Sequence, residues 1–222
     1  MDGKDNNMRT IRVTGTGQIK IRPDLTRITI SIGGVFKEYG EALKRSSEDT
    51  ERIRDLLTGF GFKRADLKTL DFHVETEYEG YQEQGIYKQR LVGYRYRHEA
   101  KVEFDSDNSR LGRILYALAN CPADPELQIS YSVKDPETVK NELIGKAVAD
   151  AKDKAAVLSR EAGVALGEIQ AIDYSLQQPV FETRPMNRMV MAKSSAGESY
   201  DMDIEPDDIL SSDTVTVVWE II

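Results

Sequence analysis

The stretch from Asp135 to Gly163 constrains the fold most, because it carries the marks of one long amphipathic helix. Pro136 suits the first helical turn, where its missing N–H would have no partner, and Asp135 before it can cap the free amides. Gly163 can supply the left-handed residue that ends a helix. Apolar residues recur along the stretch at steps of three and four, namely Val139, Leu143, Ala147, Ala151, Ala155, Leu158 and Ala162. Alanines fill the middle of this stripe, so we expect the helix to lie very close to whatever it covers.

Much of the remaining chain alternates between apolar and polar residues with the period of β-strands. The clearest alternation runs from Val92 to Phe104 and puts Arg95 and Arg97 on the second face. Together with residues 70–78, this segment predicts a long antiparallel hairpin. Further strands are predicted at 10–21, 28–34, 127–133, 169–176 and 215–221, and further helices at 38–58 and from Asp105 or Asp107 to Cys121-Pro122.

The order of these elements predicts the fold class. Strands that follow one another directly favour antiparallel pairing, and the helices can then lie on one side of the sheet. We therefore expect an α+β fold, with a mostly antiparallel sheet of about seven strands and three helices on one face. We assign residues 10–222 to a single domain after a flexible N-terminus at 1–9. Residues 179–212 predict a long mobile loop, because they hold three prolines, four methionines and most of an acidic run.

Charge and cysteine content argue against several classes of protein. A net charge of −8 repels a phosphate backbone, so we expect no nucleic-acid partner. The single cysteine, Cys121, cannot form an intrachain disulfide. The first ten residues, MDGKDNNMRT, are polar and lack the apolar core of an export signal, and no apolar run approaches the length of a membrane span. The sequence therefore predicts a cytoplasmic protein without a membrane span.

Glycine and histidine patterns in the first half could carry chemistry, but each lacks a requirement. Gly15 and Gly17 follow a strand without the third glycine and the helix of a phosphate loop, so we interpret them as a bulge or a close backbone approach, and we favour the bulge. His73 and His98 lie on the two arms of the predicted hairpin and could face one another. A metal site would need more ligands than these two, so we expect packed or rim histidines.

The acidic segment and the cysteine also fall short of a recognised site. Acidic residues alternate as in a calcium-binding loop at Asp201, Asp203, Glu205 and Asp207. Pro206 stands where that loop needs glycine, and Ser212 stands where it needs glutamate. Cys121 has no cation beside it in the sequence, which favours a buried, inert thiol. We expect no enzymatic activity, no metal and no cofactor.

Tyrosines crowd the predicted hairpin beside basic residues. Such a mixture can bind single-stranded RNA, but alternation puts Tyr94 and Tyr96 on the face opposite Arg95 and Arg97. Tyrosine with glycine and glutamine is typical of adaptable protein interfaces. We therefore predict a protein-contact surface at the hairpin tip, formed by Tyr78, Tyr81, Tyr87 and Arg90.

Several blocks of the chain resemble one family in order and content. They are VTGTGQIKIRPDLTRITISIGG, LLTGFGF followed by DLKTLDFHVETEY, LVGYRYRHEAKVEF and KAVADAKDKAAVLSREAGVALGEI. Together they are similar to the SIMPL-domain family, which comprises mostly bacterial proteins of poorly defined function, including those like oxidative-stress-defence and periplasmic immunogenic proteins. The resemblance covers residues 10–178 and the last strand. It implies an α+β domain, no established activity, homo-oligomers in some members and a loose link to oxidative stress.

The residues and the resemblance together predict a non-enzymatic SIMPL-domain protein that acts through protein–protein contacts, with copies of itself as the expected partner. Most bacterial relatives implied by the resemblance are exported, whereas the start of this chain predicts the cytoplasm. Two alternatives stay open at this point. One is a hydrolase or redox enzyme without a recognisable motif, and the other is a single-strand RNA-binding module.

Overall fold

The computed structural model describes residues 9–174, 181–183 and 205–222. The chain divides into two compact units: unit 1 comprises Met1–Pro23, Val133–Glu182 and Asp208–Ile222, and unit 2 comprises Asp24–Ser132 and Thr183–Asp207. Residues 1–8 of the expected flexible N-terminus, and most of the expected loop at 179–212, lie outside the described residues. Of the helices in the described ranges, none is both long and apolar enough to cross a membrane.

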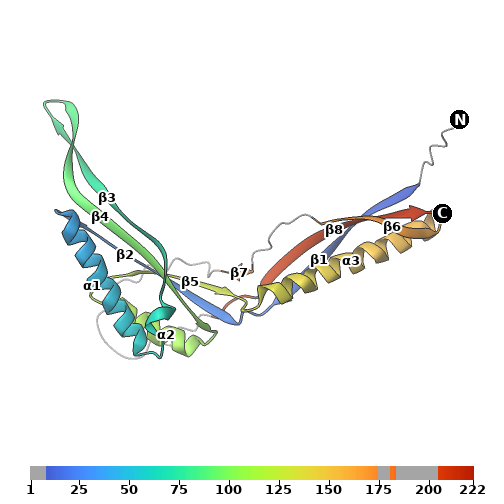
Figure 1. The fold of residues 1–222 in the computed structure, drawn as a ribbon, viewed down its shortest axis with the longest axis horizontal. Coiled ribbons are helices and arrows are strands. Elements are labelled where there is room, and N and C mark those ends of the chain that lie inside the picture. Colours follow the sequence, from blue (N-terminus) through green and yellow to red (C-terminus); the bar gives the residue numbers. More distant parts are fainter. Residues whose placement is uncertain (1–8, 175–180, 184–204) are drawn as a thin grey trace. The chain divides into compact units, whose positions relative to one another are not determined.

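Unit 1 is a three-stranded antiparallel sheet with one long helix along it (Figure 1). Its strands lie in the order β1 (Thr10–Ile21), β8 (Ile209–Ile221) and β6 (Leu166–Asp173), and its helix is α3 (Pro136–Glu161). The Asp135 side chain accepts a hydrogen bond from the Thr138 backbone N–H at 3.0 Å, as expected for the residue that caps α3. Because β8 begins at Ile209, the last residues of the predicted loop belong to a strand.

Two glycines of β1 allow α3 to approach its backbone. The helix buries one side chain per turn against the sheet, at Leu143, Ala147, Ala151, Ala155 and Ser159. A Cβ on Gly15 would lie 2.0 Å from the carbonyl oxygen of Ala147, and one on Gly17 would lie 2.1 Å from that of Leu143. The register of β1 with β8 runs unbroken from Thr10 to Ile21, so the favoured bulge at these glycines is wrong, and the alternative, a close backbone approach, is confirmed. Their role is close packing of helix on strand.

Unit 2 is a five-stranded antiparallel sheet with two helices on one face (Figure 1). The strands of this sheet lie in the order β3 (Lys68–Glu83), β4 (Ile86–Asp105), β2 (Leu25–Phe36), β5 (Glu126–Ser132) and β7 (Glu182–Thr183). The boundary between the two units falls within β7, between Glu182 and Thr183. The helices are α1 (Tyr39–Thr58) and α2 (Asn108–Ala119), and a short 3₁₀ turn spans Arg64–Asp66. Alternation along β4 sends Tyr96, Val102 and Phe104 into the core and leaves charged side chains on the opposite face.

The polar middle of α1 is buried. Ser46, Asp49 and Thr50 all face the sheet. Tyr96 of β4 donates its hydroxyl proton to Asp49 at 2.8 Å, and Thr50 lies within hydrogen-bond distance of His98. Hydrogen bonding between side chains removes most of the cost of burying these groups, which composition alone does not reveal.

The α+β class and the antiparallel pairing are confirmed, but the single sheet of about seven strands is wrong. Within the described ranges, eight strands form two sheets of three and five. The strands on either side of Pro23-Asp24 belong to different sheets. β1 pairs with β8, whereas β2 pairs with β4 and β5. Alternation predicts which face of a strand is buried, but it carries no information about the partner strand.

Candidate protein-contact surface

The β3–β4 hairpin extends beyond the rest of its sheet as a two-stranded ribbon. β4 pairs with β2 only from Tyr94 to Asp105, whereas its pairing with β3 continues out to Ile86. Figure 1 shows this ribbon running past the end of β2 and past the first turn of α1. Every residue from Tyr78 to Val92 is exposed. Two strands alone are marginally stable in water, so a ribbon of this length gains from packing against something. We call residues 78–92 the ribbon.

Two local features build the ribbon. Its tip is a two-residue turn in which Gln84 and Gly85 have φ angles of 53° and 80°, which matches the type I′ turn of tight hairpins. At its base the register shifts between Glu77 and Tyr78, so Val92 is an extra residue on β4. Beside it, a Cβ on Gly93 would lie 2.1 Å from the backbone oxygen of Phe36, so glycine lets β2 end against the hairpin.

The helix-side face of the ribbon is apolar. Alternation along β3 continues unbroken from Val74, which packs on the core under α1, through Thr76 to Tyr78. Across the ribbon, Tyr78 pairs with Leu91, and these residues are 55% and 51% exposed. Tyr87 is 67% exposed and pairs with Gln82. Its ring lies over Gly80, because a Cβ added to Gly80 would meet the hydroxyl oxygen of Tyr87. The apolar face of the sheet therefore continues beyond the helix that covers it.

The opposite face of the ribbon is occupied by ion pairs. Arg90 donates to Glu79 at 2.7 and 3.1 Å, and its guanidinium lies 5.9 Å from the centre of the Tyr81 ring. The bond to Glu79 raises the pKa of Arg90 above its ordinary value. Lys88 binds Glu83 at 2.6 Å. These charges are matched within the ribbon itself, so this face can stay in water.

The four predicted contact residues therefore divide between two faces. Tyr78 and Tyr87 lie on the helix-side face, and Tyr81 and Arg90 lie on the ion-paired face. The sequence pattern did not indicate that Leu91 of the ribbon, and Tyr39 and Leu43 at the start of α1, are exposed apolar residues on the helix side. Tyr39 packs edge-on against Tyr94 of β4, with ring centroids 5.6 Å apart. We call Tyr39, Leu43, Tyr78, Tyr87 and Leu91 the apolar patch.

The sequence of these two units matches a known family. The model of the SIMPL family, described as a protein of unknown function (DUF541), matches residues 11–219. The chain belongs to the SIMPL family. Two relatives, both named 26 kDa periplasmic immunogenic protein, come from Brucella melitensis biotype 1 and Brucella abortus strain S19. Each is 25% identical to this SIMPL chain over 182 residues, which cover 80% of the chain and 72% of the relative.

The two histidines of the SIMPL chain do not face one another. Register places His73 opposite Arg97 and His98 opposite Phe72, so the imidazoles lie on different faces of the sheet. His73 is half-exposed and binds Asp71 at 3.0 Å. Across the described ranges, no group of three or more His, Cys, Asp or Glu side chains is placed to hold a metal ion.

The other candidate residues of the SIMPL chain are distributed over separate places. Cys121 is buried after α2 in the core of unit 2, as expected. Glu205 and Asp207 are described, whereas Asp201 and Asp203 lie outside the described residues. The positions of these four acidic residues relative to one another are therefore not described.

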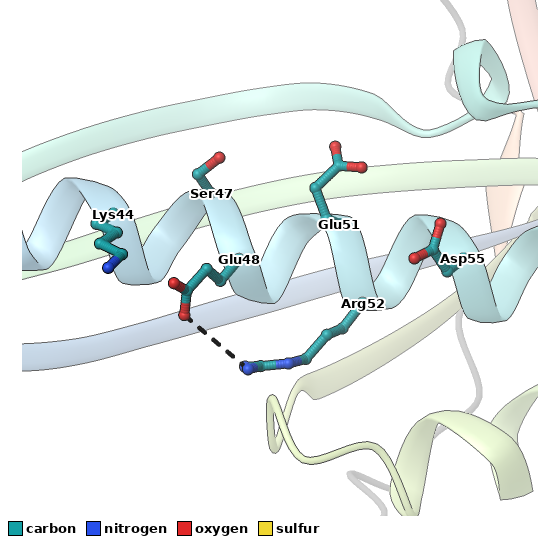
Figure 2. A pocket seen from close by; sticks show the side chains of 6 residues that line it. All are labelled: Lys44, Ser47, Glu48, Glu51, Arg52 and Asp55. Atoms are coloured by element: carbon teal, nitrogen blue, oxygen red, sulfur yellow. Dashed lines mark ion pairs between the residues drawn. The ribbon is translucent and has the colours of Figure 1, made fainter.

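A hollow of about 580 Å³ lies on unit 2, along α1 alone (Figure 2). Its lining residues are Lys44, Ser47, Glu48, Glu51, Arg52 and Asp55. Figure 2 shows these side chains spread along the helix without converging on one point, and Glu48 forms an ion pair with Arg52 at 4.0 Å. Ligand and catalytic sites usually gather groups from several elements. This arrangement is that of a solvated helix face.

Sequence reasoning also missed a buried carboxylate in the SIMPL chain. The side chain of Asp49 is only 5% exposed, and it binds Arg52 at 2.5 Å and Arg45 at 3.2 Å besides the Tyr96 hydroxyl. Burial, and then the bond to Asp49, raise the pKa of Tyr96. Asp49 thus joins two arginines of α1 to the Tyr96 hydroxyl, so this cluster fixes α1 on β4. The signal in the sequence was Asp49 among arginines at steps of three and four.

Proposed function

We propose that this SIMPL-family chain is a non-enzymatic protein that acts by protein–protein contact, and that the apolar patch binds the same patch of a second copy. The observation that carries the proposal is the apolar helix-side face of the ribbon. It continues the buried face of the sheet into solvent. Apolar surface that a monomer leaves exposed in one place marks an interaction site.

Two properties of the patch support a second copy as its partner. The patch carries no charge, and the charges of the ribbon are paired with one another on its opposite face, so the surface complements itself without a partner of opposite charge. Three half-exposed tyrosines and two leucines offer roughly 500 Å² per copy, hence roughly 1,000 Å² for a pair, which reaches the lower bound for a specific interface. Such a contact is isologous and closes as a two-fold pair.

Matched tyrosine substitutions test this contact. Tyr78→Ser removes an aromatic ring from the apolar patch, whereas Tyr81→Ser removes one from the ion-paired face three residues along the same strand. We expect Tyr78→Ser to weaken self-association at least about tenfold in sedimentation equilibrium, because central aromatic residues dominate interfaces. Tyr81→Ser should leave it nearly unchanged. A wild-type protein that stays monomeric at high concentration would refute the proposal, as would equal effects of the two substitutions.

The absence of catalysis is part of the proposal and rests on how the buried polar groups are used. Asp49 is matched by Arg45 and Arg52, and His98 is held between two threonines. The void beside His98 has a volume of only about 10 Å³. Buried groups engaged in this way hold elements together and are not presented to a substrate. Turnover of a substrate that one substitution abolishes without unfolding the protein would contradict this part.

The compartment is the last part of the proposal. Both relatives are named periplasmic, which favours an exported location for this chain over the cytoplasmic one predicted from its polar first residues. Fractionation of native cells should recover the chain with periplasmic markers, and recovery with cytoplasmic markers would contradict this.

The stress-response link implied by the family resemblance belongs to the same proposal, and survival of the same cells under peroxide, with and without the chain, tests it.

A further inference from the structure

His98 lies buried where three elements of unit 2 meet. The residue belongs to β4 and is 8% exposed. Its Nδ1 lies 2.9 Å from Oγ1 of Thr50 on α1, and its Nε2 lies 2.9 Å from Oγ1 of Thr69 at the start of β3. Phe72 of β3 packs edge-on against the imidazole, with ring centroids 5.5 Å apart. One ring thus connects the helix, the central strand and the edge strand.

The hydrogen bonds fix one tautomer of this ring. The Thr50 hydroxyl donates its single proton to the carbonyl oxygen of Ser46 at 2.7 Å, so toward His98 it can only accept. Nδ1 therefore carries the proton of the neutral ring, and Nε2 accepts a hydrogen bond from the Thr69 hydroxyl. A second proton has to bind at Nε2. The Thr69 hydroxyl then stops donating and must turn away or accept.

The core side of the ring cannot hydrate a positive charge. A void of about 10 Å³ lies beside it, lined by Ile30, Ile32, Thr50, Ile53, Leu67, His98 and Ala100. A single water needs roughly 10–15 Å³ and polar partners, whereas this lining is almost entirely apolar. An imidazolium would therefore be unsolvated on this side, whereas Thr69 beside Nε2 and Phe72 are exposed on the other.

The charged neighbours give the imidazolium no compensation. On α1, Arg54 adds a second positive charge, while Asp49 is already matched by Arg45 and Arg52. β2 presents apolar Ile32 opposite the ring. Register and alternation place the remaining charged residues of β3 and β4 nearby on the opposite face of the sheet, namely Lys68, Asp71, His73, Arg97 and Glu99. Burial, and then Arg54, lower the pKa of His98 below its ordinary value.

We propose that His98 is an acid-sensitive latch, which holds α1 and the start of β3 on β4 while its ring is neutral and releases them when Nε2 takes up a proton. The latch acts on the strand that carries Tyr78. If the proposed self-association is correct, opening of the latch should also weaken self-association in acid.

The sign of the effect follows from proton linkage. The unfolded ring titrates at its ordinary pKa of about 6.5, and the folded ring titrates below it. Below about pH 6.5 the open form binds more protons than the closed form, so it gains population as the pH falls. Above about pH 6.5 the ring is neutral in both forms, and the latch keeps its full strength. As the pH falls, the equilibrium constant for closing drops by up to about tenfold for each pH unit that separates the two pKa values.

Amide exchange and a ring titration by NMR test the latch. Protection factors of residues 68–72 should fall between pH 7 and pH 5 in the wild type. His98→Asn keeps a donor near the Nδ1 position and cannot titrate, so its protection factors should not change over that range. His73→Asn alters the exposed histidine on the other face and should keep the wild-type pH dependence.

Three results would overturn the latch. They are a ring that titrates at or above its ordinary pKa, a neutral ring protonated at Nε2, and a His98→Asn variant whose protection falls with pH as in the wild type. The titration and the tautomer are read on the wild type, so they decide even where His98→Asn fails to fold. The titration and the tautomer of His98 depend only on residues within unit 2. A strictly monomeric protein with a depressed His98 pKa would therefore uphold the latch while removing the assembly.

Discussion

At the scale of single residues, glycines and small side chains decide how the helix of unit 1 packs. Gly15 and Gly17 bring the backbone of β1 against α3, and the alanine stripe of α3 provides the matching surface. The atoms that a new side chain would meet belong to the helix backbone, which cannot rotate out of the way. Helix and strand would therefore have to separate to admit even one methyl group.

A glycine-to-alanine pair measures this packing. Gly15→Ala places a Cβ 2.0 Å from the Ala147 oxygen and 2.4 Å from the Ala151 nitrogen, and we expect a loss of about 1–3 kcal/mol in the stability of unit 1. Gly145→Ala, on the open side of α3, should instead stabilise by up to about 1 kcal/mol. The single tryptophan, Trp219, is buried in unit 1, so its fluorescence during denaturant unfolding reports both effects. Equal midpoints for the two variants would show that α3 does not press on β1.

At the scale of elements, the sequence predicts what is local and misses what is not. Residue spacing predicted α3 with its caps and the inward face of β4, because both follow from periodicity. The predicted stripe of α3 was wrong at its end, because Leu158 is half-exposed and Ser159 is buried instead. Steps of exactly four residues drift around a helix, so where the stripe ends depends on the shape of the sheet beneath it.

For the contact surface too, the sequence predicted the residues but not the features that depend on pairing. Tyr78, Tyr81, Tyr87 and Arg90 could be found from composition, but their separation into two faces could not. The faces depend on the extra residue at Val92 and on the tight turn at Gln84-Gly85. Gln-Gly is a weaker signal for such a turn than Asn-Gly or Asp-Gly, so the strands were predicted to end too early, at Tyr78 and Val92. Register across a hairpin becomes readable only once its turn is known.

At the scale of the whole molecule, each unit has its own core and its own role. Unit 1 packs α3 on a sheet built from both ends of the chain, and unit 2 carries the ribbon, the apolar patch and the His98 latch. We therefore propose a structural role for unit 1 and a contact role for unit 2, in which copies of the chain meet through the helix-side face of the ribbon.

Disulfide trapping tests that claim most directly, because the natural thiol, Cys121, is buried. Gln89→Cys places a thiol on the helix-side face of the ribbon opposite Gly80, and Lys88→Cys places one on the ion-paired face opposite Tyr81. Under mild oxidation, Gln89→Cys should become a covalent dimer at concentrations where Lys88→Cys stays monomeric. Equal cross-linking of the two variants, or none in either, would contradict the account.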